Sequence, residues 1–344
     1  MRFSRVCLEA IGYHLPEEEV TSLQLENHLA PLYERLNFAS GGLQSLTGIH
    51  ARRFWPEGTS MAEVATVAAR RALDQSGVAV EDLGVVIYAG VCRDNLEPAT
   101  ACAVANNLGV SGDVEVYDLS NACLGTLSGV LDVACRIELG FVKAGLIVAA
   151  ESARTIVEST IQKLNQTLSM PVYRLSVATL TGGSGAVALV LTHEAFSDTR
   201  RYVAGGVVKA APRHHRDCRW GPPHGLLGDV ANIMETDAQA VLASGVELGR
   251  ATWQEMQREL SWPQVDRVIG HQVGDRHRKA ILNALGLTEE MDYNSYKYLG
   301  NMGTVSVPLT AALAEEAGMI HAGDRVALLG IGSGLNCAMI GVVW

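Results

Sequence analysis

A cysteine at a strand-to-helix turn is the residue best placed for covalent chemistry. Cys123 follows a predicted strand at 114–119, and Ser120 and Asn121 are residue types that favour a helix start. A helix that starts after Ser120 and Asn121 would have the cysteine in its first turn, and this helix is predicted to end at Gly140. Free backbone N–H groups and the helix dipole favour an anion there, so we expect a lowered thiol pKa. Such a thiolate could form a thioester, although a buried, unreactive cysteine is the alternative.

Three other polar residues are candidates for the same site. His271 ends the predicted strand 265–270, at the strand edge where α/β enzymes place active sites, but a structural histidine is the alternative. Asn301 precedes an apolar helix, so it could donate a hydrogen bond or only cap that helix. Glu97 precedes Pro98 at another predicted helix start, where a carboxylate is favourable whatever its function.

A glycine-rich loop near the C-terminus completes the set. Residues 330–336 read Gly-Ile-Gly-Ser-Gly-Leu-Asn, and no helix follows, so the loop is not a dinucleotide-binding fingerprint. Together these residues suit acyl transfer. Cys123 would accept the acyl group, and His271 and Asn301 would hydrogen-bond the oxygen of an enolate. The backbone N–H groups of Cys123 and Ser333 would hold the thioester oxygen.

An internal repeat places these residues on equivalent elements of two halves. Cys123 and Asn301 are separated by 178 positions (301 − 123), as are Ala144 and Ala322 (322 − 144). Two similar βαβαβ-type halves imply a pseudo-twofold fold. The first half has helix 60–76, strand 85–89, helix 98–108, strand 114–119 and strand 144–150. The second half has a helix at 236–260 with a possible break near Gly245, strand 265–270, helix 276–285, a strand near 291–297 and strand 325–331.

Composition excludes several classes of protein. The 344 residues are 48% hydrophobic and 19% charged, as in a globular α/β protein, and the net charge of −10 argues against a nucleic-acid-binding surface. No run approaches the roughly 18 apolar residues of a membrane span, and the N-terminus lacks a signal-peptide core. The seven cysteines are spread out and lack a Cys-x-x-Cys pair. We therefore expect a cytoplasmic protein with no zinc site and no other metal or cofactor.

Taken together, these motifs resemble the thiolase superfamily, specifically its β-ketoacyl synthase III branch, over essentially the whole length. The motifs that match are Ala122-Cys123-Leu124-Gly125, His271-Gln272, Gly300-Asn301 and the glycines of 330–334. The resemblance implies an α/β protein with the five-layered αβαβα thiolase fold, built from two pseudo-twofold-related halves. The N-terminal half would be 1–195 and the C-terminal half 196–344. It also implies a homodimer.

Within that branch, the sequence resembles the enzymes that open bacterial long-chain olefin and β-lactone biosynthesis. Those enzymes join two fatty acyl-CoAs head to head without decarboxylation. The segments Ser-Asn-Ala-Cys-Leu-Gly, Glu-Ser-Ala-Arg and Leu-Gly-Asn-Met-Gly-Thr-Val-Ser carry this resemblance. The subfamily uses a glutamate from the partner subunit to remove an α-proton. Glu97 matches it, 26 residues before Cys123 (123 − 97). A carboxylate is an effective base when burial raises its pKa toward neutral.

Two other reactions remain compatible with the sequence. A decarboxylating synthase that uses malonyl-acyl carrier protein would share every residue except the need for Glu97. An acyltransferase or thioesterase would move the Cys123-bound acyl group to an alcohol, amine or water. A degradative thiolase is disfavoured because it would carry a second cysteine inside the glycine-rich loop, whereas Cys337 follows that loop.

The substrate contacts are the least defined feature. Segments 152–182 and 205–230 would line acyl channels, but they contain no motif that fixes chain length. Local positive charge makes three arginines candidates for binding CoA, with a solvated loop as the alternative: Arg213, Arg216 and Arg219. An acyl carrier protein or a downstream pathway enzyme is a further possible partner.

Overall fold

Nine strands form a continuous order in the computed structural model, which describes residues 1–221 and 233–344. The order is β11-β12-β13-β8-β1-β7-β6-β4-β5. Within these residues, β1 (Val6–His14) and β8 (Tyr202–Ala210) pair as strands at a single position, Cys7 with Tyr202. The sheet therefore divides at this point into two parts. The first also contains β7 (Gly185–His193), β6 (Ala144–Glu151), β4 (Leu83–Tyr88) and β5 (Glu115–Asp118). The second also contains β13 (Asn336–Val343), β12 (Arg325–Gly332) and β11 (Arg267–Gly270).

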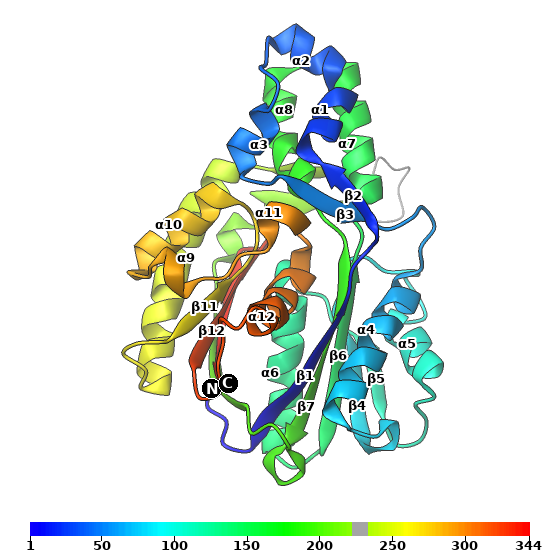
Figure 1. Ribbon diagram of the computed structural model, residues 1–344, viewed down its shortest axis with the longest axis vertical. Coiled ribbons are helices and arrows are strands. Elements are labelled where there is room, and N and C mark those ends of the chain that lie inside the picture. The colour runs from blue at the N-terminus through cyan, green and yellow to red at the C-terminus, as the bar shows by residue number, and fades with distance from the viewer. Residues whose placement is uncertain (222–232) are drawn as a thin grey trace.

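Helices form three layers around the two parts of the sheet (Figure 1). The central layer is α6 (Gly125–Glu138) and α12 (Ser306–Glu316), which contact strands of both parts. α4 (Met61–Ser76) and α5 (Thr100–Leu108) cover the outer face of the first part. α9 (Ala238–Leu260) and α10 (Asp275–Leu285) lie on the opposite side, where α9 packs on β8 and β13. This arrangement is the predicted αβαβα fold.

The pseudo-twofold repeat is visible in one reciprocal contact. Thr126 and Thr304 are also 178 positions apart (304 − 126). The Thr126 N–H donates to Thr304 Oγ1 at 2.7 Å, and the Thr126 hydroxyl donates to the Thr304 carbonyl at 2.7 Å. Both threonines are buried, so the two equivalent turns meet at the centre of the molecule. The proposed halves 1–195 and 196–344 meet between β7 and β8, and this division stays a prediction.

A small lobe at one end of the molecule, drawn at the top of Figure 1, has its own apolar cluster. It contains α1 (Ser22–His28), α2 (Ala30–Leu36), α3 (Gly42–Thr47), α7 (Arg154–Thr167) and α8 (Met170–Ser176). The two-stranded antiparallel sheet of β2 (Glu18–Thr21) and β3 (Ala51–Phe54) joins the lobe to the rest of the molecule. The two helices α7 and α8 occupy the segment 152–182, to which the sequence pattern assigned no element.

Two predicted features of the second half are wrong. α9 continues through Gly245 without a break, and a Cβ added there would lie 2.8 Å from Ile331 Cδ1. The glycine therefore allows close packing. The strand near 291–297 is replaced by a single bridge at Asp292 and the short helix α11 (Tyr296–Leu299). Gln272 accepts hydrogen bonds from the N–H groups of Ser295 and Tyr296, which are then not available to a strand ladder.

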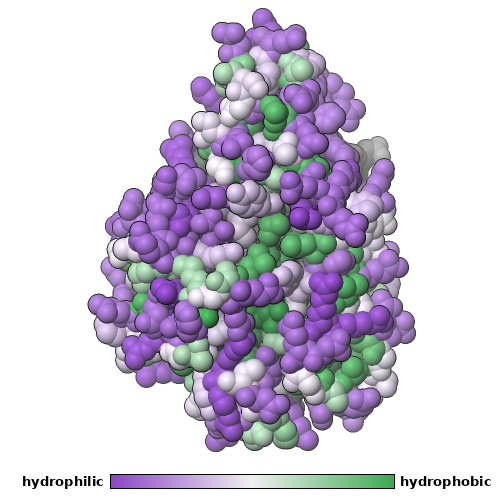
Figure 2. Space-filling view, viewed as in Figure 1, coloured by the Kyte–Doolittle hydropathy of each residue, from purple (hydrophilic) through white to green (hydrophobic). Residues whose placement is uncertain are grey.

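The viewed face of the molecule differs in hydropathy between its edge and its centre. Figure 2 shows hydrophilic side chains around the periphery of the viewed face and hydrophobic ones gathered near its centre, around α12. Among the described helices, none combines the length and apolar character needed to cross a bilayer.

Candidate active site

Cys123 lies in a short 3-10 turn, Ala122–Leu124, and α6 begins only at Gly125. The prediction that this cysteine lies within the first turn of the helix is therefore wrong. Ala122 has φ +45°, a left-handed conformation that costs energy for a residue with a side chain. Asn121 does not cap the helix, because its side chain donates to Ser128 Oγ at 2.9 Å and accepts from Asn336 Nδ2 at 3.3 Å. These bonds hold the strained turn that presents the cysteine.

The pKa of the Cys123 thiol is raised rather than lowered. Although part of the residue is exposed, burial of the thiol, together with the nearby Cys218 and Glu151, raises its pKa to about 12. The expected lowering by a helix N-terminus is therefore wrong. The physical reason is that desolvation and neighbouring acidic groups outweigh the attraction of the backbone N–H groups. Attack by this sulfur must be accompanied by loss of its proton.

The glycine-rich loop is the turn of the β12–β13 hairpin and lies against the cysteine. A Cβ added to Gly332 would lie 3.4 Å from the Cys123 nitrogen. Ser333 follows directly, at the start of the turn between the two strands. The turn therefore brings the Ser333 backbone into the neighbourhood of the Cys123 backbone, but the paired oxyanion role of their N–H groups stays a prediction.

His271 follows β11, and its backbone N–H donates to the Leu329 carbonyl of β12 at 2.9 Å. Its Nδ1 is buried, and no described residue hydrogen-bonds to it. Burial, with a smaller effect of His277, lowers the pKa of His271 to about 3. The imidazole is therefore neutral at physiological pH, with one ring N–H available to donate.

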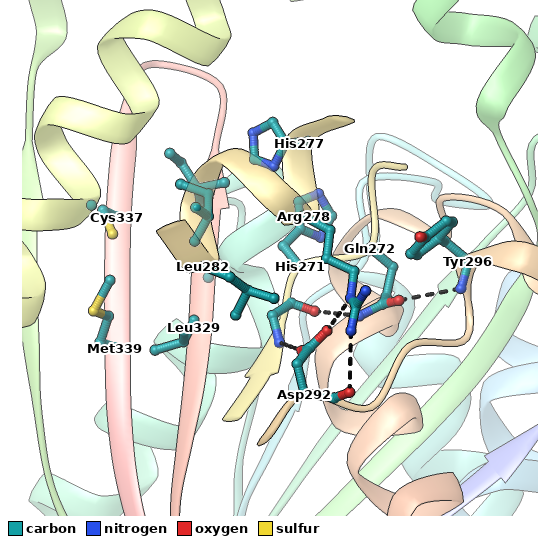
Figure 3. A pocket seen from close by; sticks show the side chains of 15 residues that line it. His271, Gln272, His277, Arg278, Leu282, Asp292, Tyr296, Leu329, Cys337 and Met339 are labelled. Atoms are coloured by element: carbon teal, nitrogen blue, oxygen red, sulfur yellow. Dashed lines mark hydrogen bonds and ion pairs between the residues drawn. The ribbon is translucent and has the colours of Figure 1, made fainter. Parts of the chain in front are cut away.

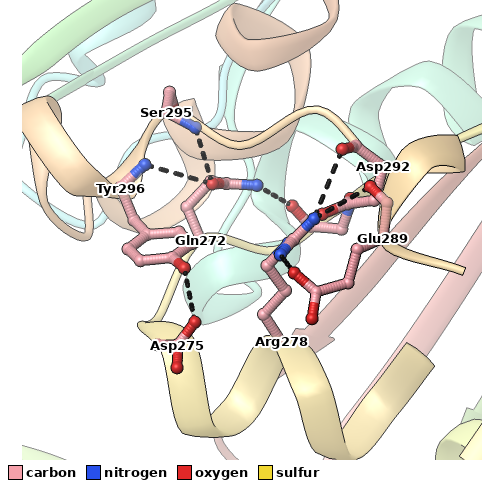
Figure 4. A network of polar contacts seen from close by, with 8 residues as sticks. Gln272, Asp275, Arg278, Glu289, Asp292, Ser295 and Tyr296 are labelled. Atoms are coloured by element: carbon pink, nitrogen blue, oxygen red, sulfur yellow. Dashed lines mark hydrogen bonds and ion pairs between the residues drawn. The ribbon is translucent and has the colours of Figure 1, made fainter. Parts of the chain in front are cut away.

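A polar network holds the backbone on both sides of His271 (Figure 4). The buried Gln272 donates to the Gly270 carbonyl at 2.6 Å and accepts from the Ser295 N–H at 2.9 Å. Arg278 pairs with Asp292 at 2.5 Å, and Asp292 accepts from the Gly270 N–H at 3.4 Å. The glutamine of the His-Gln motif thus fixes the histidine loop to the segment that precedes Asn301.

Asn301 is fixed at its backbone and at one side-chain atom. Its N–H donates to the Thr181 carbonyl at 2.8 Å, and its carbonyl accepts from the Gly183 N–H at 2.9 Å. Its Oδ1 accepts from the Gly303 N–H at 3.0 Å. The side-chain NH₂ group is then the part of the amide left to donate to another molecule. Because the turn after Asn301 contacts the Cys123 turn through Thr126 and Thr304, the two predicted site residues lie on touching turns.

Glu97 lies apart from these contacts, on an exposed loop formed by residues 91–99, which we call the Glu97 loop. No hydrogen bond or ion pair within residues 1–221 and 233–344 engages its carboxylate. Neighbouring Leu96 and Val91 are 69% and 38% exposed, which is high for apolar side chains. The structure thus joins the Cys123 turn to the Asn301 turn and fixes the His271 loop to the segment before Asn301, but no bond of the Glu97 side chain joins it to these elements within one chain.

The three candidate CoA-binding arginines are exposed on the segment before the undescribed residues. Arg219 pairs with Glu235 at 3.6 Å, and Arg213 donates to His214 at 3.1 Å. Cys218, in the same segment, is close enough to raise the pKa of Cys123, so the segment lies near the nucleophile. The roles of Arg213, Arg216 and Arg219 stay predictions. The part of the predicted acyl-channel segment at 222–230 lies outside the described residues.

A cavity extends from the histidines toward α9 and the β12–β13 hairpin (Figure 3). His271, His277 and Arg278 lie on one side of it, and Ile281 and Leu282 of α10 extend its lining. The rest of the lining includes apolar residues of the two strands, namely Leu329, Ile331, Cys337 and Met339. The lining therefore combines polar groups at one end with hydrocarbon walls, and it does not include Cys123.

Comparison with known proteins places this site in a family. The chain is 47% identical to the acyl-CoA:acyl-CoA alkyltransferase of Shewanella oneidensis, with 100% of both proteins covered. It is 35% identical to the acyl-CoA:acyl-CoA alkyltransferase of Xanthomonas campestris, again with 100% of both covered. Residues 256–344 match the family described as 3-oxoacyl-(acyl-carrier-protein) synthase III C terminal. The chain belongs to the β-ketoacyl synthase III branch of the thiolase superfamily.

A solved structure of a member of this branch agrees over the whole fold. Xanthomonas campestris OleA with bound lauric acid and lauroyl-CoA has a TM-score of 0.93 at 33% identity, covering 99% of this chain and 100% of that chain. Other structures of that OleA carry a replaced cysteine, histidine or glutamate. As a member of this branch, the chain is an acyltransferase, which confirms the predicted class of enzyme.

Two residues of the site were not predicted from the sequence. Glu151 is a buried carboxylate at the end of β6 that influences the Cys123 thiol. His277 lies on α10 beside the cavity, and burial lowers its pKa to about 4. Glu151 could have been found, because an acidic residue that ends an otherwise apolar strand lies at the active-site edge of an α/β sheet. His277 lies within a polar helix start, where no sequence signal separates it from its neighbours.

Proposed function

We propose that this protein catalyses the non-decarboxylative Claisen condensation of two fatty acyl-CoA thioesters to a β-ketoacyl product. The observation that carries the proposal is the unengaged Glu97, exposed on a well-anchored loop 26 residues before Cys123 (123 − 97). In Xanthomonas campestris OleA, the replaced glutamate and the replaced cysteine are also 26 positions apart. A decarboxylating enzyme generates its carbanion by losing CO₂ and needs no such base.

The first half-reaction transfers an acyl group to the cysteine. The Cys123 sulfur attacks the thioester carbonyl of the first acyl-CoA, the thiol loses its proton, and CoA leaves as its thiol. Backbone N–H groups of Cys123 and Ser333 stabilise the oxyanion of the tetrahedral intermediate. The chain then carries a thioester at Cys123.

The second half-reaction forms the carbon–carbon bond. Glu97 of the partner subunit removes an α-proton from the second acyl-CoA. The neutral His271 and the NH₂ group of Asn301 donate hydrogen bonds to the enolate oxygen, which stabilises the developing charge. The carbanion attacks the Cys123 thioester carbonyl, the C–S bond breaks, and the Cys123 sulfur regains a proton as the β-ketoacyl-CoA is released. Hydrolysis of that thioester by water then gives the β-keto acid and the second CoA. The chemistry needs only protein groups, acyl-CoA and water, so we propose that no metal or other cofactor takes part.

A homodimer would complete the site. β5 (Glu115–Asp118) is an edge strand of the sheet, and such an edge can pair with the same strand of a second copy. The Glu97 loop is fixed to this edge, since Asp118 accepts from the Thr100 and Ala101 N–H groups at 3.0 and 2.9 Å. Arg93 also lies 3.6 Å from Asp118. A loop attached to a dimerising edge strand is well placed to enter the partner subunit.

The proposal also covers the compartment of the reaction and the contacts with CoA. We place the reaction in the cytoplasm, because all seven cysteines are free and a reducing compartment suits a catalytic thiol. CoA phosphates would meet the exposed Arg213, Arg216 and Arg219, since guanidinium groups suit phosphate. Acyl carrier protein as donor, a downstream enzyme as partner, and the decarboxylating or ester-forming reactions remain alternatives for the assay below.

The test uses one saturated acyl-CoA, such as lauroyl-CoA, as the only substrate. We expect continuous CoA release and a β-keto acid, or the ketone formed from it by loss of CO₂, identified by mass. Glu97→Ala should acylate Cys123 in a single burst and then stop, with condensation reduced at least about 100-fold. Glu63→Ala, which changes an exposed glutamate on α4, serves as the control and should behave as wild type. Condensation by Glu97→Ala at the wild-type rate would contradict the proposed base.

A further inference from the structure

Glu151 is a buried carboxylate that the reaction described above does not use. Only 5% of it is exposed, and it ends the fully buried strand β6. Its two oxygens accept hydrogen bonds from consecutive backbone N–H groups, Oε1 from Val91 at 2.9 Å and Oε2 from Cys92 at 3.2 Å. These N–H groups belong to the first two residues of the Glu97 loop. The Cys92 thiol also hydrogen-bonds to this carboxylate. A buried acid with no cationic partner is costly, so it calls for a function.

The same carboxylate also touches the turn after Asn301. A Cβ added to Gly303 would lie 3.4 Å from Glu151 Oε1, so this turn packs directly on the acid. The titratable groups that face Glu151 are Tyr88 of β4, Cys92 of the Glu97 loop and Cys123. No lysine, arginine or histidine of the described chain pairs with it. Its charge is therefore balanced by backbone N–H groups, and its position depends on them.

The rest of the Glu97 loop is anchored in the same way, by acids that accept from backbone N–H groups. Asp94 accepts from the N–H groups of Met61 and Ala62 at 2.7 and 2.9 Å, at the start of α4. Asp118 holds the far end of the loop through Thr100 and Ala101. Glu97 lies between these two anchors. Glu151 is the anchor that also contacts the turn after Asn301 and raises the pKa of the Cys123 thiol.

We propose that Glu151 is a positioning residue that sets the Glu97 loop, so that Glu97 reaches the substrate on Cys123 of the partner subunit. The inference rests on the proposed function. Its physical basis is that a carboxylate offers acceptor lone pairs on both oxygens, which the N–H groups of Val91 and Cys92 require. A protonated or amidated side chain turns one of those oxygens into a donor, which would repel one N–H and shift the loop.

The titration of Glu151 is consistent with this role. Burial raises its pKa to about 7, while the Val91, Cys92 and Thr304 backbone groups oppose the rise. Glu151 is therefore mostly neutral below about pH 7 and mostly ionised above it. The ionised form, which can accept from both N–H groups, therefore predominates on the alkaline side of neutrality.

The experiment places Glu151→Gln in one chosen subunit of a heterodimer. The reference heterodimer combines a Cys123→Ala subunit with a Glu97→Ala subunit and is isolated through two different affinity tags. Its one complete site uses Glu97 of the first subunit and Cys123 of the second. Glu151→Gln is then added either to the subunit that supplies Glu97 or to the subunit that bears Cys123. Glu63→Gln, at an exposed position, is added in the same two ways as a control.

We expect condensation to fall at least about tenfold when Glu151→Gln is in the subunit that supplies Glu97. Acylation of Cys123 should not change in that heterodimer, because the acylated subunit keeps Glu151. Loss of condensation with unchanged acylation would not occur if Glu151 only stabilised the fold around the cysteine of its own subunit. Reference-level condensation in that arrangement, or loss only when the change is in the Cys123 subunit, would overturn the inference.

Two further controls keep the result interpretable. If Glu151→Gln yields no heterodimer, Glu151→Asp is used, which keeps both acceptor oxygens on a shorter side chain and should lose less condensation activity than any other replacement. Glu151→Ala behaving like Glu151→Asp would contradict the need for acceptors. An inactive reference heterodimer, with the wild-type protein still active, would instead overturn the proposed action of Glu97 across the dimer, on which this inference rests.

Discussion

At the residue scale, the central question is the protonation of the nucleophile. Burial raises the pKa of Cys123 to about 12, so the thiol is protonated throughout the physiological range. Its thiolate fraction must then increase with pH and show no plateau near neutrality. This differs from a cysteine activated by a helix N-terminus, whose thiolate would already predominate at pH 8.

Alkylation kinetics test this point directly. We expect the rate of Cys123 alkylation by iodoacetamide to rise about tenfold per pH unit between about pH 7 and pH 10. The modified peptide is followed by mass spectrometry, which separates it from the peptides of the other cysteines, and Cys123→Ser provides the blank. A rate that levels off below pH 8 would show that the thiol pKa is lowered, contrary to this structure.

The spacing of the repeat was sufficient to predict that Cys123 and Asn301 lie on equivalent turns, which contact each other, but not the electrostatics around them. The cysteine and histidine motifs each follow a strand of the repeat, whereas the strand predicted before Asn301 is replaced by the short helix α11. The direction of the Cys123 pKa shift depends first on burial of the thiol and then on Cys218 and Glu151, and all of these arise only from the fold. For the same reason the sequence did not reveal that Glu151 holds the Glu97 loop.

At the element scale, helix α9 shows why a glycine is not always a break. Gly245 and Gly249 both lie inside this helix of 23 residues. A Cβ at Gly245 would meet Ile331 Cδ1 at 2.8 Å, whereas a Cβ at Gly249 would meet Ile281 Cδ1 at 3.6 Å, which is ordinary contact. The two positions therefore form a matched pair with the same helix propensity and different packing.

We expect Gly249→Ala to raise the free energy of unfolding by about 0.5–1 kcal/mol, because alanine restricts the unfolded chain and favours the helix. Gly245→Ala should raise it less or lower it, since the Ile331 side chain must move. Urea unfolding of both variants measures the difference. Equal stabilisation by the two alanines would show that Ile331 does not limit the packing at α9.

Long periodic segments were predicted correctly, and short irregular ones were not. α4 begins after Ser60 and ends before Gly77, as its capping residues indicate. In contrast, the segment 291–297 carries strand-like residues, but Gln272 takes its N–H groups and a short helix forms. Apart from α7, the helices of the small lobe have only 6 or 7 residues, which is too few to show a clear period.

At the scale of the whole molecule, the repeat determines where the chemistry occurs. The offset of 178 positions brings Thr126 against Thr304, and this contact fixes the Cys123 turn to the Asn301 turn. The repeat, and with it the layered fold, could be predicted from the sequence. A residue supplied by a second copy could not be placed by spacing within one chain. The family resemblance implies such a residue, and the exposed, unengaged Glu97 beside an edge strand is compatible with it.

The proposed reaction requires that Cys123 of one subunit carries the first acyl group while Glu97 of the other subunit deprotonates the second acyl-CoA. The most direct measurement mixes equal amounts of Cys123→Ala and Glu97→Ala proteins, allows subunits to exchange, and follows condensation from lauroyl-CoA. Each variant alone should be inactive. Random exchange makes half of the dimers mixed, each with one complete site of two, so activity should recover to about a quarter of wild type. No recovery, despite proven exchange of subunits, would contradict the account.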